Sequence, residues 1–158
     1  MPLLAVLLFA APSGAATLQG RVVAVTDGDT VKVLDASHTE WKIRLMGIDA
    51  PEKKQAFGNR SKSNLSDLVY GKSVTVEYSK KDRYGRIVGK ILVNGVDANL
   101  EQVRAGMAWH YKQYAKEQIA EDRETYARAE EQSRTGRQGL WKDVAPEPPW
   151  DWRKTRKR

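Results

Sequence analysis

The sequence predicts an α+β domain that is mainly β: a five-stranded Greek-key OB-fold barrel, the oligonucleotide-binding type, with three helices. Four short segments alternate apolar and polar residues, which is typical of strands, and a fifth, mostly apolar segment follows a polar turn. Three segments with helical spacing are inserted between and after these strands. This arrangement favours a small closed sheet over a parallel sheet built from repeated strand–helix units.

The predicted strands are short and bounded by turn residues. They cover residues 18–25, 30–34, 41–45, 74–78 and 87–93. The first two are separated by residues 26–29, whose Asp-Gly step is a strong turn signal. A second polar turn, residues 82–86, precedes the last strand. The alternation inside the first four segments predicts one face toward a core and one toward solvent.

The first predicted helix, residues 59–70, places Leu65, Leu68 and Val69 on one face and ends at Gly71. The second helix starts at Asp97, a good N-cap residue, and carries an apolar face. That face comprises Leu100, Val103 and Met107, with Gly106 near the helix end.

The third predicted helix, residues 116–132, is highly charged and has a thin apolar stripe. The stripe consists of Ile119, Tyr126 and Ala129. After it, Leu140 and Trp141 are expected to fold back onto the core, because large apolar side chains are rarely left in solvent.

Residues 1–16 carry no charged side chain and contain an apolar run followed by small residues. The run is shorter than the roughly 20 residues that span a bilayer. It resembles a secretory signal peptide cut near Ala15 or Ala16, although no basic residue follows Met1. We therefore expect a secreted or periplasmic protein. A different start site or an uncleaved membrane anchor remains the alternative.

We assign residues 17–144 to one domain and residues 145–158 to a proline-rich exit with a basic tail, expected to be disordered. The chain has 27 Lys and Arg against 20 Asp and Glu, a net charge of +7, and five of these positive charges lie in the tail. The excess favours a polyanionic partner. The absence of cysteine excludes disulfides and thiolate metal sites.

The segment from Arg44 to Glu52 is the first candidate for chemistry. Gly47 and Pro51 break the strand pattern and leave Arg44, Asp49 and Glu52 close together in the sequence. One cation and two carboxylates can hold a phosphate, a metal ion and an attacking water. For this segment alone, a surface turn with ordinary ion pairs explains the residues equally well.

Two other turns supply the remaining parts of a phosphodiester-cleaving site. Asp29 and Asp49, with the Ala50 carbonyl, offer oxygen ligands suited to Ca²⁺, and so few carboxylates predict a weak site. Glu52 is the candidate base for water. Arg44 and Arg86 can neutralise charge that develops on phosphate oxygens.

Three motifs, TDGDTVKV, RLMGIDAPE and DRYGR, occur in this order and resemble those of the staphylococcal nuclease (thermonuclease) family. The likeness extends from about residue 18 to 141 and includes GMAWHYKQY, as in secreted and plasmid-borne bacterial members. The resemblance implies a calcium-dependent endonuclease that cuts DNA and RNA between phosphorus and the 5′ oxygen, leaving 3′-phosphate ends. Nothing in the sequence indicates an oligomer, and we expect a monomer without an obligate protein partner.

By motif position, the resemblance implies metal binding by Asp29, Asp49 and the Ala50 carbonyl, and catalytic roles for Arg44, Glu52 and Arg86. Asp27 falls beside the metal rather than on it. Ala50 stands where the best-known members carry Thr, so a hydroxyl contact is missing.

Substrate contacts are expected from Arg83, Tyr84, Tyr111 and Tyr114. Arg83 replaces a lysine that contacts the terminal phosphate, and either of the last two tyrosines could stack on a base. His38 and His110 are weaker candidates for a base. The alternative function is a binding module that holds single-stranded nucleic acid on the same barrel without cutting it.

Overall fold

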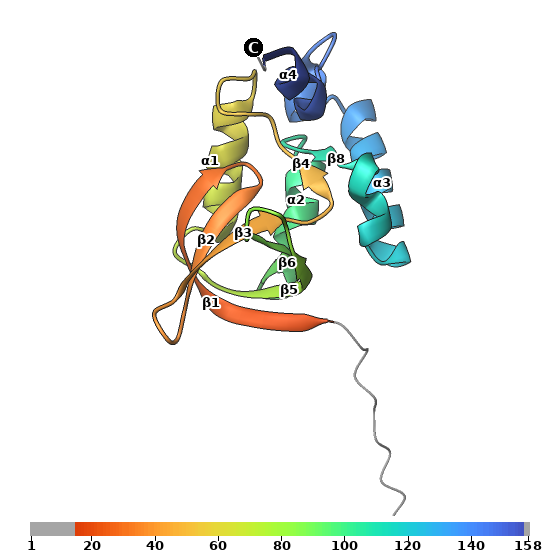
Figure 1. Cartoon of the computed structure of the whole chain (residues 1–158). Coiled ribbons are helices and arrows are strands. Elements are labelled where there is room, and N and C mark those ends of the chain that lie inside the picture. The colour runs from red at the N-terminus through yellow and green to blue at the C-terminus, as the bar shows by residue number, and fades with distance from the viewer. Residues whose placement is uncertain (1–14, 157–158) are drawn as a thin grey trace, which may run out of the picture.

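The structure, a computed structural model, describes residues 15–156 and contains a closed barrel of five strands (Figure 1). The strands are β1 (Ala16–Asp27), β2 (Thr30–Asp35), β3 (Glu40–Leu45), β5 (Ser73–Lys81) and β6 (Ile87–Val93). They pair in the order β3-β2-β1-β5-β6, and a parallel pairing of β3 with β6 closes the barrel. The predicted mainly β barrel is confirmed.

β1 is longer than predicted because it pairs with two neighbouring strands, β2 and β5. Residues from Ala16 to Arg21 pair with β5, and residues from Gly20 to Asp27 pair with β2. Two register shifts in the β2 pairing let the strand bend around the barrel. The predicted signal segment lies largely outside the described residues, but its last residue, Ala16, already pairs with Tyr78.

The barrel interior is filled by apolar strand residues; the alternation predicted those of β2 and β3, but in β1 it indicated Val23 and Val25, which are only partly buried. The interior residues include Val22, Val31, Val33, Ile43, Leu45, Val76, Ile87 and Ile91, all nearly inaccessible to solvent. Burial of each such side chain stabilises the fold by about 1.5–3 kcal/mol before entropy costs. Helix α1 (Gly58–Val69) packs against β1 and adds Leu65 and Val69 to this core.

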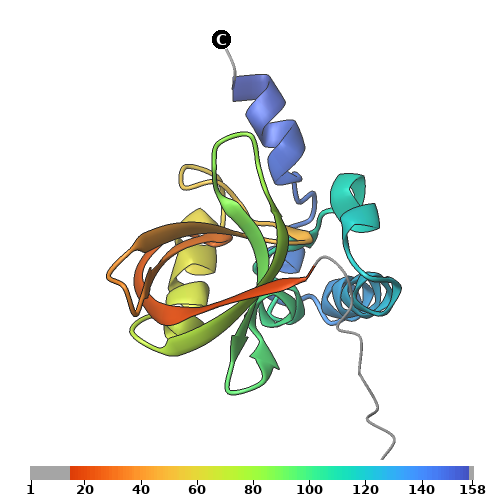
Figure 2. The same ribbon diagram turned by 60° about the horizontal axis from the view of Figure 1, so that its bottom comes forward.

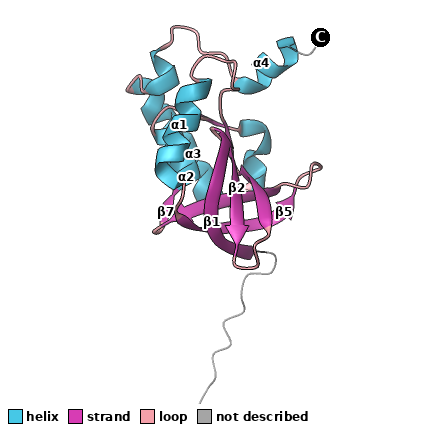
Figure 3. Cartoon of the chain, turned by 90° about the vertical axis from the view of Figure 1, so that its left-hand side faces the viewer, coloured by secondary structure: helices cyan, strands magenta, loops and turns pink. Residues whose placement is uncertain are grey.

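The helices lie together on one side of the barrel (Figure 3). Helix α2 (Ala98–Arg104) is capped as predicted, since the Asp97 carboxylate accepts a hydrogen bond from the Leu100 amide at 3.0 Å. The helix ends before Met107, which the prediction had included, because Gly106 takes a left-handed conformation with φ of 68°. Short strands β4 (Ile48–Asp49), β7 (Val96–Asp97) and β8 (Trp109–His110) complete the sheets.

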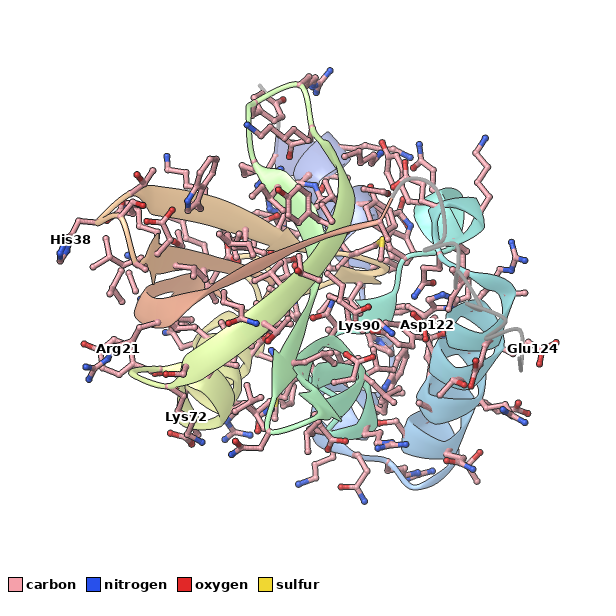
Figure 4. The ribbon with its side chains drawn as sticks, turned by 90° about the horizontal axis from the view of Figure 1, so that it is seen from below. Arg21, His38, Lys72, Lys90, Asp122 and Glu124 are labelled. Atoms are coloured by element: carbon pink, nitrogen blue, oxygen red, sulfur yellow. The ribbon has the colours of Figure 1, made fainter. Side chains whose placement is uncertain are left out.

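Helix α3 (Ala120–Thr135) starts later than predicted, and a 3₁₀ helix, η1 (Lys112–Glu117), precedes it. Tyr126 and Ala129 are buried as expected. Ile119 is not part of the apolar stripe: it precedes the helix and is 64% exposed. Figure 4 shows Lys90 of β6 beside Asp122 of α3, and their ion pair of 2.7 Å joins the helix to the barrel.

The predicted disorder of residues 145–158 is wrong for most of that segment. Residues Pro149–Arg156 form helix α4, and residues 157–158 lie outside the described part of the chain. After the 3₁₀ helix η2 (Gly139–Lys142), Leu140 and Trp141 fold back as expected and form a small cluster with Trp109, against which Trp150 packs. Across residues 15–156, no helix is long and apolar enough to cross a membrane.

Candidate active site

The β1–β2 turn and the segment after β3 are joined by backbone hydrogen bonds at one end of the barrel. The Leu45 amide donates to the Asp29 carbonyl at 2.8 Å, and the Ala50 amide donates to the Asp29 carboxylate at 2.8 Å. Gly47, with φ of 80°, allows the chain to reverse between β3 and β4. The two sequence motifs therefore meet in one place.

Arg44 connects the two aspartates. Its Nη2 atom lies 3.3 Å from an oxygen of Asp29 and 3.3 Å from an oxygen of Asp49. Its Nη1 atom donates to the carbonyls of Leu45 and Ile48, both at 2.9 Å. Both carboxylates are buried, so Arg44 holds them together at this end of the barrel.

Charge and burial act in opposite directions on these carboxyl groups. Burial raises the pKa of Asp49 to about 6, and the charge of Asp29 adds to that effect. Burial likewise raises the pKa of Asp27 to about 7, with a further contribution from Asp29. Burial would also raise the pKa of Asp29, but the charge of Arg44 and several hydrogen bonds outweigh it and lower that pKa. A further cation here would favour the ionised forms of all three.

The oxygen atoms near Asp29 and Asp49 are the kind of ligand that a hard cation such as Ca²⁺ prefers. Asp29 and Asp49 present carboxylate oxygens, and the backbone of Ala50 lies against Asp29. In residues 15–156, no group of three or more His, Cys, Asp or Glu side chains could hold a metal ion. A cation here would therefore need backbone oxygen and water in addition to the two carboxylates, which is usual for calcium. Asp27 instead accepts the Asp29 amide at 3.1 Å and supports the turn.

Glu52 follows directly on the same segment and is half-buried. Its carboxylate and that of Asp49 share one partner, the guanidinium of Arg153, at 2.8 Å from Glu52 Oε1. Arg153 therefore joins Glu52 to Asp49, and the Glu52 side chain remains partly accessible to water.

The β5–β6 turn carries Arg83, Tyr84 and Arg86 but makes no direct bond to the carboxylates. Arg86 donates to Asp82 at 2.7 Å, and the Arg83 guanidinium lies 4.8 Å from the centre of the Tyr84 ring. In the parallel pairing Arg44 lies opposite Val88, two residues after Arg86. Arg86 thus borders the strand that carries Arg44, and Figure 2 shows this turn on the same side of the barrel as α4.

Tyr111 and Tyr114 lie together, with ring centres 4.8 Å apart and planes at 72°. The Tyr111 amide donates to the Gly47 carbonyl at 2.9 Å, which fixes this tyrosine beside the site. Burial and the negative charge of Asp49 raise the pKa of its hydroxyl. The face of Tyr111 is stacked on Trp150, with the rings 5.4 Å apart and 4° from parallel.

Arg153 is the residue of this site that sequence reasoning missed. Its guanidinium donates to both oxygens of Asp49, at 3.0 and 2.8 Å, and to Glu52. Hydrogen bonds to Asp49, despite partial burial, raise its pKa above that of a free arginine. The available signals were Pro149, well suited to start a helix, and the unexplained tryptophans Trp150 and Trp152.

The two histidines do not contact the carboxylate cluster. His38 projects from the β2–β3 turn at one edge of the molecule (Figure 4) and has a φ of 60°. His110 is buried, its Nε2 lies 2.8 Å from the Gln118 side chain, and burial lowers its pKa. Both are best explained as structural residues.

Comparison with known proteins gives a consistent result. Residues 42–143 match a family model described as staphylococcal nuclease homologue. The chain is 44% identical over 151 residues to an uncharacterized endonuclease of Escherichia coli, covering 95% of this chain and 94% of that protein. It is 44% identical over 137 residues to an uncharacterized endonuclease of Haemophilus influenzae, covering 87% and 74%. It is 37% identical over 162 residues to a micrococcal nuclease of Shigella flexneri, covering 97% and 90%.

Proposed function

Because the chain belongs to the staphylococcal nuclease family, we propose that it is a calcium-dependent endonuclease that hydrolyses phosphodiester bonds in DNA and RNA. The observation that carries this proposal is that Arg44 contacts both Asp29 and Asp49, and that Arg153 joins Asp49 to Glu52. A cation site, a candidate base and a guanidinium are the parts that phosphodiester hydrolysis requires.

Each residue has a chemical task in this proposal. Asp29, Asp49 and the Ala50 carbonyl would hold calcium, which would polarise the phosphate and orient a water. Glu52 accepts a proton from the attacking water, since its carboxylate is partly exposed beside the aspartates. Arg44 and Arg86 neutralise charge that builds on the phosphate oxygens.

In the proposed reaction, water attacks phosphorus in line with the bond that breaks. The water oxygen bonds to phosphorus, the bond from phosphorus to the 5′ oxygen breaks, and the departing oxygen takes up a proton. The products are a 3′-phosphate end and a 5′-hydroxyl end. Arg83 and Tyr84 on the exposed turn, with Tyr111 and Tyr114, form the proposed contacts to the rest of the substrate.

A chelation experiment tests the proposal. Purified protein is incubated with heat-denatured DNA or with RNA, in calcium or in EGTA. We expect cutting in calcium, loss of cutting in EGTA, and recovery when calcium is added in excess. Unchanged cutting in EGTA would exclude calcium from the mechanism. Tight binding of intact substrate at every calcium concentration would instead indicate a binding module.

We also propose that residues 1–16 direct export to the periplasm or the medium, on the strength of their composition. Ala16 is the first residue of β1 and pairs with Tyr78 of β5, so a cut after Ala15 would keep the whole of β1. N-terminal sequencing of the protein recovered outside the cytoplasm tests this. An intact Met1 on membrane-bound material would indicate an anchor.

A further inference from the structure

The first observation is that Arg153 binds Asp49 and Glu52, the proposed calcium ligand and the proposed base. Arg153 donates to both carboxylate oxygens of Asp49 and to Oε1 of Glu52, at 2.8–3.0 Å. A guanidinium is permanently charged and forms a planar fork that fits carboxylates. It therefore supplies the positive charge that a cation would otherwise bring to Asp49. The Asp49 oxygens cannot be fully engaged by both.

The second observation is independent of charge. Trp150 is stacked on the ring of Tyr111, whose amide is bonded to Gly47 beside the site, and also contacts Trp109 edge-on at 5.5 Å. A nucleic acid base that stacks on Tyr111 would need this surface. Trp150 and Arg153 are three residues apart in α4, so both project from one face of the helix. The same helix covers the aromatic surface and the carboxylates.

The third observation is that α4 has few attachments to the rest of the protein. The helix has eight residues, and a helix of that length is marginal without tertiary contacts. The segment that leads to it contains Pro146 and Pro148, with a fully exposed Val144. One further contact, from the Gln55 side chain to the Glu147 carbonyl at 2.7 Å, holds this approach. Such elements open more readily than the core.

From these observations we propose that α4 is an autoinhibitory strap. It closes the site by placing Arg153 on Asp49 and Glu52 and Trp150 on Tyr111, and it leaves when calcium and nucleic acid bind. This inference rests on the proposed nuclease function. The strap lowers the apparent affinity for calcium by the fraction of molecules in which it is open. A strap open in about 1–10% of molecules weakens calcium binding about 10- to 100-fold.

The test is calcium binding to the full chain without substrate, by isothermal titration calorimetry, for the wild type and for Arg153→Gln. We expect Arg153→Gln to bind calcium about 10-fold or more tightly than the wild type. Lys154→Gln is the matched control, because it removes the same charge from an exposed position of the same helix and should change nothing. Equal or weaker binding by Arg153→Gln, or no calcium binding by either protein, would overturn the proposal.

Hydrogen exchange gives a second measurement that does not depend on cleavage. Calcium should speed amide exchange in α4 of the wild type, and Arg153→Gln should exchange fast without calcium. Slower exchange of α4 in calcium would overturn the strap. If Arg153→Gln binds calcium more tightly but neither protein cuts nucleic acid, the strap stands and the nuclease proposal fails. If the wild type cuts in calcium and the substitution leaves binding unchanged, only the strap fails.

Discussion

Arg44 lies between the buried carboxylates of Asp29 and Asp49. In this position it stabilises the fold, in addition to the catalytic role that we propose for it. Four hydrogen bonds or ion pairs fix its guanidinium, to Asp29, Asp49 and two backbone carbonyls. Its removal leaves two buried acids without their shared cation. The residue that would neutralise phosphate charge therefore also holds the site together.

We expect Arg44→Ala to destabilise the calcium-free protein by about 3–5 kcal/mol, because it leaves the buried charge of Asp29 without a cation, whereas Asp49 keeps Arg153. Arg44→Lys should cost less, since the charge remains but the planar fork is lost. Urea unfolding without calcium measures both. Arg21→Ala, on the exposed face of β1 (Figure 4), is the control and should have little effect. A loss below about 1 kcal/mol in Arg44→Ala would contradict this account of the residue.

Arg86 and Arg83 should differ in kinetics although they share one turn. Arg86→Ala should lower kcat by about 10²- to 10³-fold, because it removes charge stabilisation in the transition state. Arg83→Ala should mainly raise KM, since Arg83 contacts only the exposed Tyr84 among the described residues. Steady-state cleavage of a labelled oligonucleotide measures both. Equal, mild losses in both variants would mean that the roles are wrongly assigned.

At the residue scale, the sequence predicted the acids and arginines of the site but not every contact among them. Asp29, Asp49 and Glu52 were identifiable because turn residues set them apart from strands. Arg153 was not, because nothing in a run of basic residues indicates which one will meet a carboxylate distant in the sequence. The bond from Arg86 to Asp82 was also missed, since a polar turn permits many pairings.

At the scale of elements, α2 depends on Asp97 for two separate contacts. The carboxylate caps the helix at the Leu100 amide and also accepts the Tyr126 hydroxyl of α3 at 2.7 Å. Asp97 therefore ties the start of one helix to the middle of another.

Asp97→Ala should destabilise the protein by about 1–3 kcal/mol, since it removes the cap and leaves the buried Tyr126 hydroxyl without this partner. Tyr126→Phe should cost less. In the double variant the two losses of unfolding free energy should not add, because each single substitution already removes the hydrogen bond between Tyr126 and Asp97. Thermal or urea unfolding measures the cycle, with the exposed Glu124→Ala as control. Strict additivity would show that the contact contributes nothing.

The bounds of helices and strands could be predicted where the local sequence pattern allowed only one interpretation. The bounds of β6 match the prediction, because a mostly apolar run is set off by polar turns on both sides. α3 was displaced by several residues, because charged residues in η1 and α3 give no clear start. α4 was missed altogether, since eight residues with two tryptophans show little helical periodicity. Its tertiary contacts hold it in place: Trp150 packs on Trp109 and Tyr111, and Arg153 pairs with Asp49 and Glu52.

At the scale of the whole molecule, the barrel brings distant segments into one place. The antiparallel pairing of β2 and β3 sets Thr30 opposite Arg44, and the parallel pairing of β3 and β6 brings the Arg86 turn alongside. The sequence predicted the strands and a closed barrel, but not which two strands close it, because the parallel pairing of β3 with β6 leaves no local signal.

The central claim is that Glu52 acts on water within a calcium site built from Asp29 and Asp49. The most direct measurement is the cleavage rate of a labelled DNA oligonucleotide by Glu52→Gln and the wild type at saturating calcium, with calcium binding measured on the same samples. The account predicts a rate lower by about 10²- to 10⁴-fold with calcium binding retained. A Glu52→Gln protein that cuts within about threefold of the wild-type rate would contradict it.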